Sequence, residues 1–183
     1  MRPVAVAVTG GIGAGKSEAL HAFERRGVPV RSSDEVVHRL IAGDPAVRAA
    51  LAQRFGTTDR SRIAEIVFGD RDELEWLERL LHPRVRDDYL AWRESLDAKV
   101  CAVEVPLLYE TGADAGFDAV VVITAPEELR AGRSPAAVAQ RSARLLPDEE
   151  KARRADFAYV NDGPLDDLDA FVGGVLEQLR SRR

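Results

Sequence analysis

The sequence has little of what secreted and membrane-spanning proteins depend on. Cys101 is the only cysteine among 183 residues, so no disulfide can form within the chain. No apolar run approaches the roughly 20 residues that a membrane-spanning helix needs. The apolar run at residues 3–8 is also too short for a signal peptide. We therefore expect a cytoplasmic protein with no membrane partner.

An excess of positive charge is missing as well. The formal net charge is −5, which argues against broad nucleic-acid binding, because such proteins need clustered lysine and arginine to displace counterions. The charge is uneven, however, since residues 130–154 carry seven basic and three acidic side chains. That segment is either a solvated helix face or a local phosphate clamp. The length suits one compact domain, and a monomer is the favoured oligomeric state.

Alternating apolar and amphipathic segments predict an α/β fold. Nearly continuous apolar runs, typical of strands buried on both faces, occur at residues 4–9, 28–31, 99–105, 118–123 and 157–160. Helical patterns separate them. We predict a doubly wound parallel sheet of about five strands with helices on both faces, as in P-loop NTPases. Ligands bind such sheets at the carboxyl ends of the strands.

The middle of the chain reads as helical. Residues 40–98 are too many for one crossover, so we expect a substrate-side cap beside a core of residues 1–35 and 99–183. A long helix opened by Asp70 should be kinked or broken by Pro83. A lid at about residues 126–150 should contain a helix that begins at Ser134. All of these parts belong to one predicted domain, residues 1–183.

A phosphate-binding motif follows the first predicted strand. Residues 10–17 read GGIGAGKS, which fits G-x-x-x-x-G-K-[ST] between a buried strand and a helix. Glycines let backbone N–H groups converge on phosphate, Lys16 supplies a mobile cation for the β- and γ-phosphates of ATP, and the Ser17 hydroxyl can ligate Mg²⁺. The predicted nucleotide-binding residues here are Gly11, Gly13, Ala14, Gly15, Lys16, Ser17 and Glu18. The motif alone does not separate kinases from other nucleotide-binding proteins.

Asp34 is the candidate general base. It directly follows the second predicted strand, so its carboxylate should emerge at the sheet edge that carries the phosphate loop. There it could orient an attacking hydroxyl and accept its proton. The competing interpretation is an aspartate that only stabilises the first turn of a helix.

The chain resembles dephospho-coenzyme A kinase over nearly its whole length. Five regions carry the resemblance, in the family's order: VTGGIGAGKS at 8–17, GVPVRSSDEVV at 27–37, LLHPRVR at 80–86, VEVPLLYE at 103–110, and RADF with NDG at 154–163. Each region is weak alone, but the ordered set is specific.

The resemblance implies transfer of phosphate from ATP to the 3′-hydroxyl of dephospho-coenzyme A, with Asp34 as base. It further implies that Leu107 and Leu108 line the acceptor pocket and that His82 lies in the cap. By the residues alone, His82 is an ordinary helix residue and the leucines are core residues. The turn with Asn161 and Gly163 resembles the one that meets adenine in related nucleotide kinases.

Four departures from the family pattern bear on activity. Glu18 places a carboxylate near the phosphates, Ser32 replaces an aspartate, and Leu145 replaces a common glutamine. The lid is also several residues short, which leaves Arg133 and Arg141 as the best candidates to neutralise the transferred group, with Arg130 and Arg144 behind them. Two alternatives therefore remain open: a nucleotide-binding relative with impaired catalysis, and a kinase for another hydroxyl.

Overall fold

The computed structural model describes residues 2–133 and 146–181. The chain divides into two compact units, one made of Met1–Ser32 and Leu96–Arg183, the other of Ser33–Ser95. The two units are described separately below. No described helix has both the length and the apolar character needed to cross a membrane.

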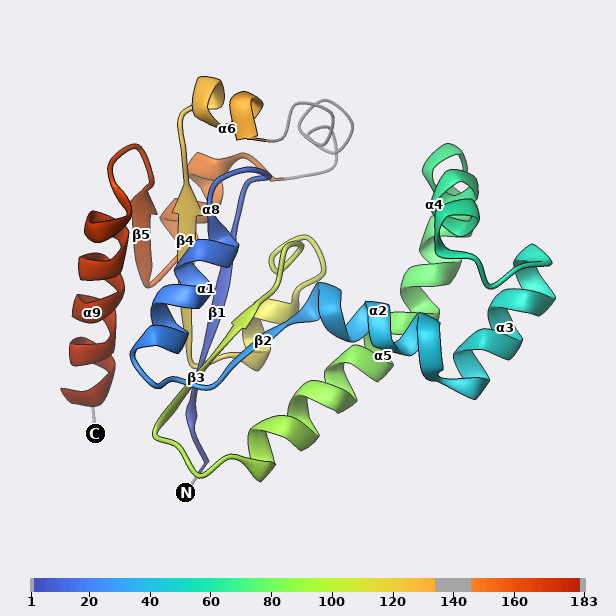
Figure 1. Ribbon diagram of the computed structural model, residues 1–183, viewed down its shortest axis with the longest axis horizontal. Coiled ribbons are helices and arrows are strands. Elements are labelled where there is room, and N and C mark those ends of the chain that lie inside the picture. The colour runs from blue at the N-terminus through green and yellow to red at the C-terminus, as the bar shows by residue number, and fades with distance from the viewer. Residues whose placement is uncertain (1, 134–145, 182–183) are drawn as a thin grey trace. The chain divides into compact units, whose positions relative to one another are not determined.

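The first unit is built on a parallel sheet of five strands, in the order β2-β3-β1-β4-β5 (Figure 1). The pairing partners place Val8 of β1 beside Glu104 of β3 and Val121 of β4. The prediction of a five-stranded parallel sheet is confirmed. The strands are β1 (Val4–Gly10), β2 (Val30–Ser32), β3 (Val100–Glu104), β4 (Ala119–Thr124) and β5 (Phe157–Val160).

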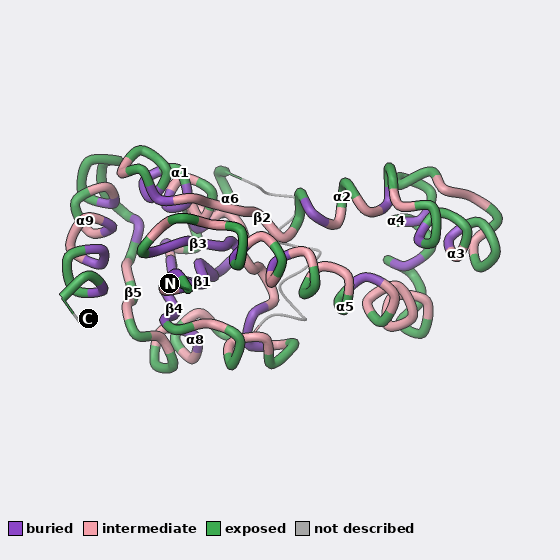
Figure 2. Tube along the Cα trace, turned by 90° about the horizontal axis from the view of Figure 1, so that it is seen from below, coloured by how far each residue is buried: buried purple, intermediate pink, exposed green. Residues whose placement is uncertain are grey.

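Both faces of this sheet are covered. Helices α1 (Lys16–Arg25) and α9 (Leu165–Ser181) pack with Val6 and Val8 on one face. Leu108, Leu146 and helix α8 (Asp148–Arg154) pack with Ala7 on the other. Successive β1 residues point to opposite faces, so a run of apolar residues serves both layers. The central strands β1, β3 and β4 are almost entirely buried, whereas β2 and β5 at the two edges of the sheet are partly exposed (Figure 2). Helix α6 (Glu127–Arg133) and the 3-10 turn η1 (Ala113–Gly116) complete the described elements of this unit.

Two aspartates fasten the sheet at the amino ends of its strands. Asp118, just before β4, accepts a hydrogen bond from the Ala5 amide (2.8 Å) and donates its own amide to the Ala5 carbonyl (2.9 Å). Asp156, just before β5, makes the same pair of bonds with Val120, at 2.8 and 3.1 Å. Each aspartate therefore pins a strand to its neighbour at the edge opposite the phosphate loop.

The second unit contains helices α2 (Ser33–Gly43), α3 (Pro45–Phe55), α4 (Arg60–Gly69) and α5 (Arg71–Ser95). Asp44 and Asp59 cap α3 and α4 by accepting backbone N–H bonds, which satisfies donors that a helix start leaves unpaired. An apolar cluster that includes Val47, Leu51 and Ile63 holds the helices together.

Helix α5 is not broken at Pro83, which was one of the two outcomes expected there. It continues from Arg71 to Ser95 through Pro83, although proline removes one hydrogen bond from a helix interior. Pro83 is exposed, and so is Arg79, whose carbonyl loses that bond. Leu81 and Tyr89 are buried on either side of it. Packing therefore holds the helix across a local defect that faces solvent.

Candidate phosphate-transfer site

The loop between β1 and α1 turns sharply at its glycines. Gly13 and Gly15 have φ values of 73° and 99°, a region that side chains with a Cβ rarely adopt. Ala14 between them is fully buried and anchors the loop in the core. Helix α1 then begins at Lys16, so the loop runs directly into a helix amino terminus, where unpaired N–H groups favour anions.

Asn161, which follows the outermost strand β5, bonds to this loop. Its buried side-chain amide donates to the Ala14 carbonyl at 2.8 Å, and its backbone N–H donates to Thr124 at 2.7 Å. A Cβ added to Gly15 would lie 2.3 Å from Nδ2 of Asn161. The predicted residue Asn161 thus shapes the phosphate loop. Gly163, two residues further on, is exposed.

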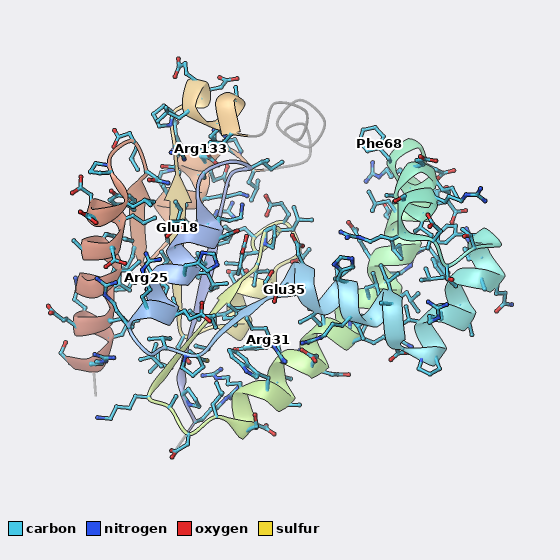
Figure 3. All side chains as sticks on the ribbon, in the orientation of Figure 1. Glu18, Arg25, Arg31, Glu35, Phe68 and Arg133 are labelled. Atoms are coloured by element: carbon cyan, nitrogen blue, oxygen red, sulfur yellow. The ribbon has the colours of Figure 1, made fainter. Side chains whose placement is uncertain are left out.

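Helix α6 brings two arginines against the same loop. Arg133 donates to the Gly13 carbonyl at 3.3 Å, and its position beside the loop is visible in Figure 3. Arg130 forms an ion pair with Asp148 (3.1 Å). A Cβ added to Gly11 would lie 2.7 Å from Arg130 and 2.8 Å from Asp148. Arg141, Arg144 and Leu145, and the helix predicted to begin at Ser134, lie outside the described residues.

Lys16 and Ser17 stand at the start of α1. The Lys16 ammonium donates to the Gly11 carbonyl at 3.0 Å, so the side chain folds back over the loop. The Ser17 hydroxyl donates to Oε2 of Glu104 at 3.3 Å. Glu104 ends the adjacent strand β3 and is 8% exposed. A hydroxyl and a carboxylate are the oxygen ligands that Mg²⁺ prefers, so this pair fits the metal that the motif implies.

Glu104 was not among the site residues predicted from the sequence. The available signal was an acidic residue at the end of an otherwise apolar strand, KVCAVEV. Buried carboxylates are rare unless they are paired or bind metal. The acidic residue points to the phosphate site only when β3 is known to lie beside β1.

The Glu18 carboxylate is paired with residues of its own helix. Its Oε1 accepts from Arg25 at 2.9 Å, and its Oε2 lies 3.6 Å from Nδ1 of His21. Both partners lie further along α1, and Figure 3 shows Glu18 and Arg25 on the same side of the helix. Because Arg25 neutralises this carboxylate, the expected repulsion between Glu18 and bound phosphate loses its main basis.

Asp34 occupies the first turn of α2, two residues after β2 ends. The side chain is exposed and is therefore open to a ligand. It belongs to the second compact unit, so its role as base stays a prediction that rests on chain position.

The residues predicted to bind the acceptor are in different settings. Leu108 is fully buried against Ala7 and Val122, so it supports the loop from the core, whereas Leu107 is half-buried. His82 is exposed on α5. Of these three residues, Leu107 and His82 retain surface for contact with a ligand.

These features together define a P-loop kinase-type fold. A glycine loop enters a helix, the helix serine meets an acidic residue from the neighbouring strand, and arginines approach the loop from α6. A crystal structure of shikimate kinase from Acinetobacter baumannii shares this fold, with a TM-score of 0.58 at 13% identity over 99% of this chain and 95% of that one.

Comparison with known sequences gives the family. The model of dephospho-CoA kinase matches residues 4–167, and the chain belongs to the dephospho-CoA kinase family. It is 38% identical to the dephospho-CoA kinase of Mesorhizobium japonicum, with 98% of each chain covered. It is 36% identical to that of Deinococcus radiodurans, with 97% of this chain and 93% of the relative covered.

Solved structures agree with this assignment. A crystal structure of a Thermus thermophilus protein matches with a TM-score of 0.85 and 31% identity, covering 98% of this chain and 99% of that one. The dephospho-CoA kinase from Campylobacter jejuni matches with a TM-score of 0.70 and 26% identity, covering 96% of each chain. The resemblance inferred from the ordered motifs is confirmed.

Proposed function

We propose that this protein transfers the γ-phosphoryl group of ATP to the 3′-hydroxyl of dephospho-CoA, giving CoA and ADP. One observation carries the proposal: a chain of this family keeps a complete phosphate loop whose Ser17 contacts the buried carboxylate of Glu104. Loop glycines, lysine, serine and strand-end acid are the parts that phosphoryl transfer from ATP uses.

The chain's own groups divide the work. Amides of residues 13–17 and the Lys16 ammonium bind the β- and γ-phosphates, and Arg133 adds positive charge beside the loop. Ser17 and Glu104 would hold Mg²⁺, which neutralises the charge on the phosphates when it is bound. Arg141 remains a candidate for a second neutralising cation.

Asp34 would act on the acceptor. β2 runs parallel to β3 and ends at Ser32, so the chain that continues to Asp34 leaves the sheet at its carboxyl edge. Its carboxylate would take the proton of the attacking hydroxyl. A bond forms between that oxygen and the γ-phosphorus, and the bond to the bridging oxygen breaks so that ADP leaves.

The remaining predicted residues would bind the two substrates. Leu107 and His82 would contact dephospho-CoA, with Leu108 supporting Leu107 from the core. The turn at residues 161–163 would meet adenine through its backbone, because the side-chain amide of Asn161 is bonded to Ala14.

A coupled ADP assay tests the proposal. Purified protein with ATP and Mg²⁺ should release ADP only when dephospho-CoA is added, and CoA should form in equal amount. ATP binding by calorimetry with no product over hours would instead establish the impaired relative. A panel of other hydroxyl compounds addresses the remaining alternative, since release of ADP with one of them alone would identify a different acceptor.

A further inference from the structure

A charged pair is buried beneath the sheet, away from the phosphates. Lys151 of α8 is fully buried, and its Nζ lies 2.8 Å from Oε1 of Glu110. The Glu110 side chain is 13% exposed, and its Oε2 has no hydrogen-bond partner within residues 2–133 and 146–181. Removing two charges from water is costly unless they face each other. The proposed chemistry does not use either residue.

Glu110 ties the loop after β3 to the segment that leads into α8. Its Oε1, which lies 2.8 Å from the Lys151 ammonium as an ion pair, also accepts a hydrogen bond from the Leu146 amide at 2.9 Å. The next residue back, Tyr109, is buried, and the guanidinium of Arg154 lies 5.7 Å from the centre of its ring. The loop that carries Leu107 is therefore held to the middle and the carboxyl end of α8 and to the segment just before it.

The same helix also reaches the phosphate loop. Asp148 lies three residues before Lys151, at the start of α8, and forms the ion pair with Arg130 that covers Gly11. Nε of Arg130 is buried without a hydrogen-bond partner in the described part of the chain. The guanidinium thus rests at the phosphate loop, where Asp148 is its ion-pair partner among residues 2–133 and 146–181.

We propose that Glu110 and Lys151 are positioning residues for phosphoryl transfer. They hold α8 in place, so that Asp148 keeps the Arg130 guanidinium against Gly11, where it stabilises the charge of the bound phosphates. This proposal rests on the function proposed above.

The test is a cycle of four proteins: wild type, Glu110→Gln with Lys151→Met, Arg130→Met, and the combined variant. The first pair of substitutions removes both charges at similar volume and keeps an acceptor for the Leu146 amide. We expect that pair to lower kcat on the order of tenfold, since small misplacement of a charge-stabilising group has effects of this size or larger. In the Arg130→Met background the same substitutions should change kcat by less than about twofold.

Two results would overturn the proposal. One is an unchanged kcat in the Glu110→Gln, Lys151→Met protein. The other is a loss of kcat that persists in full without Arg130, because a merely structural pair would act independently of that arginine. Arg153→Met serves as the matched control, since Arg153 is exposed on the same helix and should leave kcat unchanged.

A second variant covers the case in which the charge-free pair does not fold. Asp148→Asn breaks the contact to Arg130 from a partly exposed position, and its effect must also vanish in the Arg130→Met background. If the proposed function is wrong, the wild-type protein itself makes no CoA, so this outcome is distinct from the effects of the variants. In that case the Kd of ATP is measured for the same four proteins. An effect of the Glu110 and Lys151 substitutions on this Kd that disappears without Arg130 supports the proposal, and an effect that is the same with and without Arg130 refutes it.

Discussion

The side-chain amide of Asn161 donates a hydrogen bond of 2.8 Å to the carbonyl of Ala14, 147 residues earlier in the chain. This bond joins the end of β5 to the centre of the phosphate loop. It also occupies the space that a side chain at Gly15 would need.

Asn161→Ala should therefore loosen the phosphate loop. Loss of a buried bond leaves the Ala14 carbonyl unpaired, at a cost of about 1–3 kcal/mol in the free energy of unfolding. Gly15→Ala should abolish ATP binding, because the added methyl strains φ and collides with Nδ2. Urea denaturation measures the first effect, and calorimetric titration with ATP measures the second.

Gly174→Ala is the matched control for the glycine substitution. Gly174 lies inside α9, and a Cβ there meets nothing within 4 Å. Its replacement should leave ATP binding intact and raise stability by up to about 1 kcal/mol. Normal ATP affinity in the Gly15→Ala protein would contradict the tight fit described here.

Asp34→Asn should reduce kcat by orders of magnitude while the Kd of ATP stays the same. The amide keeps the shape of the carboxylate but cannot accept the proton of the attacking hydroxyl. Glu35→Gln is the control, because Glu35 is the adjacent exposed acid on the same helix. If turnover in the Asp34→Asn protein stays near the wild-type value, another group is the base.

Glu104→Gln should raise the Mg²⁺ concentration needed for half-maximal activity. The substitution removes the negative charge beside the Ser17 hydroxyl, and divalent cations bind carboxylates far better than amides. Removal of metal with a chelator should abolish wild-type turnover. Glu24→Gln is the control, because Glu24 is exposed on α1, and it should not shift the Mg²⁺ requirement. An equal shift in both variants would show that Glu104 has no specific role in binding Mg²⁺.

Asp169 should make stability depend on pH in the acid range. Hydrogen bonds from Arg26 and then Arg25 lower the pKa of Asp169 to about 2 from an ordinary 3.8. Because the pKa of Asp169 is lower in the folded protein than in the unfolded chain, its ionised carboxylate stabilises the folded state at pH values above the unfolded pKa. This contribution to stability is lost as the pH falls from about 4 toward 2.

Asp169→Asn is the corresponding variant. It should lower the urea midpoint at pH 7, and the difference from wild type should shrink as the pH falls through that window. A difference that stays constant from pH 7 to pH 2 would show that the ion pairs with Arg25 and Arg26 contribute nothing to stability.

Much of the sheet was predictable, because β1, β3, β4 and β5 are apolar runs that can be recognised locally. The short strand β2, Val30–Ser32, was predicted two residues too early, at residues 28–31, because only its first residue is apolar. The phosphate loop was also predictable, since its eight residues are contiguous. Glu104 was not, because its meaning depends on the pairing that places it beside Val8. The role of Asn161 was missed for a similar reason, since its partner is distant in the chain.

Contacts along a helix modify two expectations that came from single residues. The carboxylate of Glu18 was expected near the phosphates, yet Arg25 lies two helical turns away on the same face and binds it. Of the kink or break expected at Pro83, the break does not occur, because buried residues on both sides keep α5 in place. In both cases a neighbour on the same helix outweighed the tendency of the single residue.

The aspartates before β4 and β5 have a consequence for how this architecture can change. Because Asp118 and Asp156 set the alignment of the strands from the edge remote from chemistry, insertions or deletions in the connections at the opposite edge leave the sheet undisturbed. A protein built in this way can shorten or lengthen the segment after β4 and still present Lys16 and Ser17 from an unaltered framework.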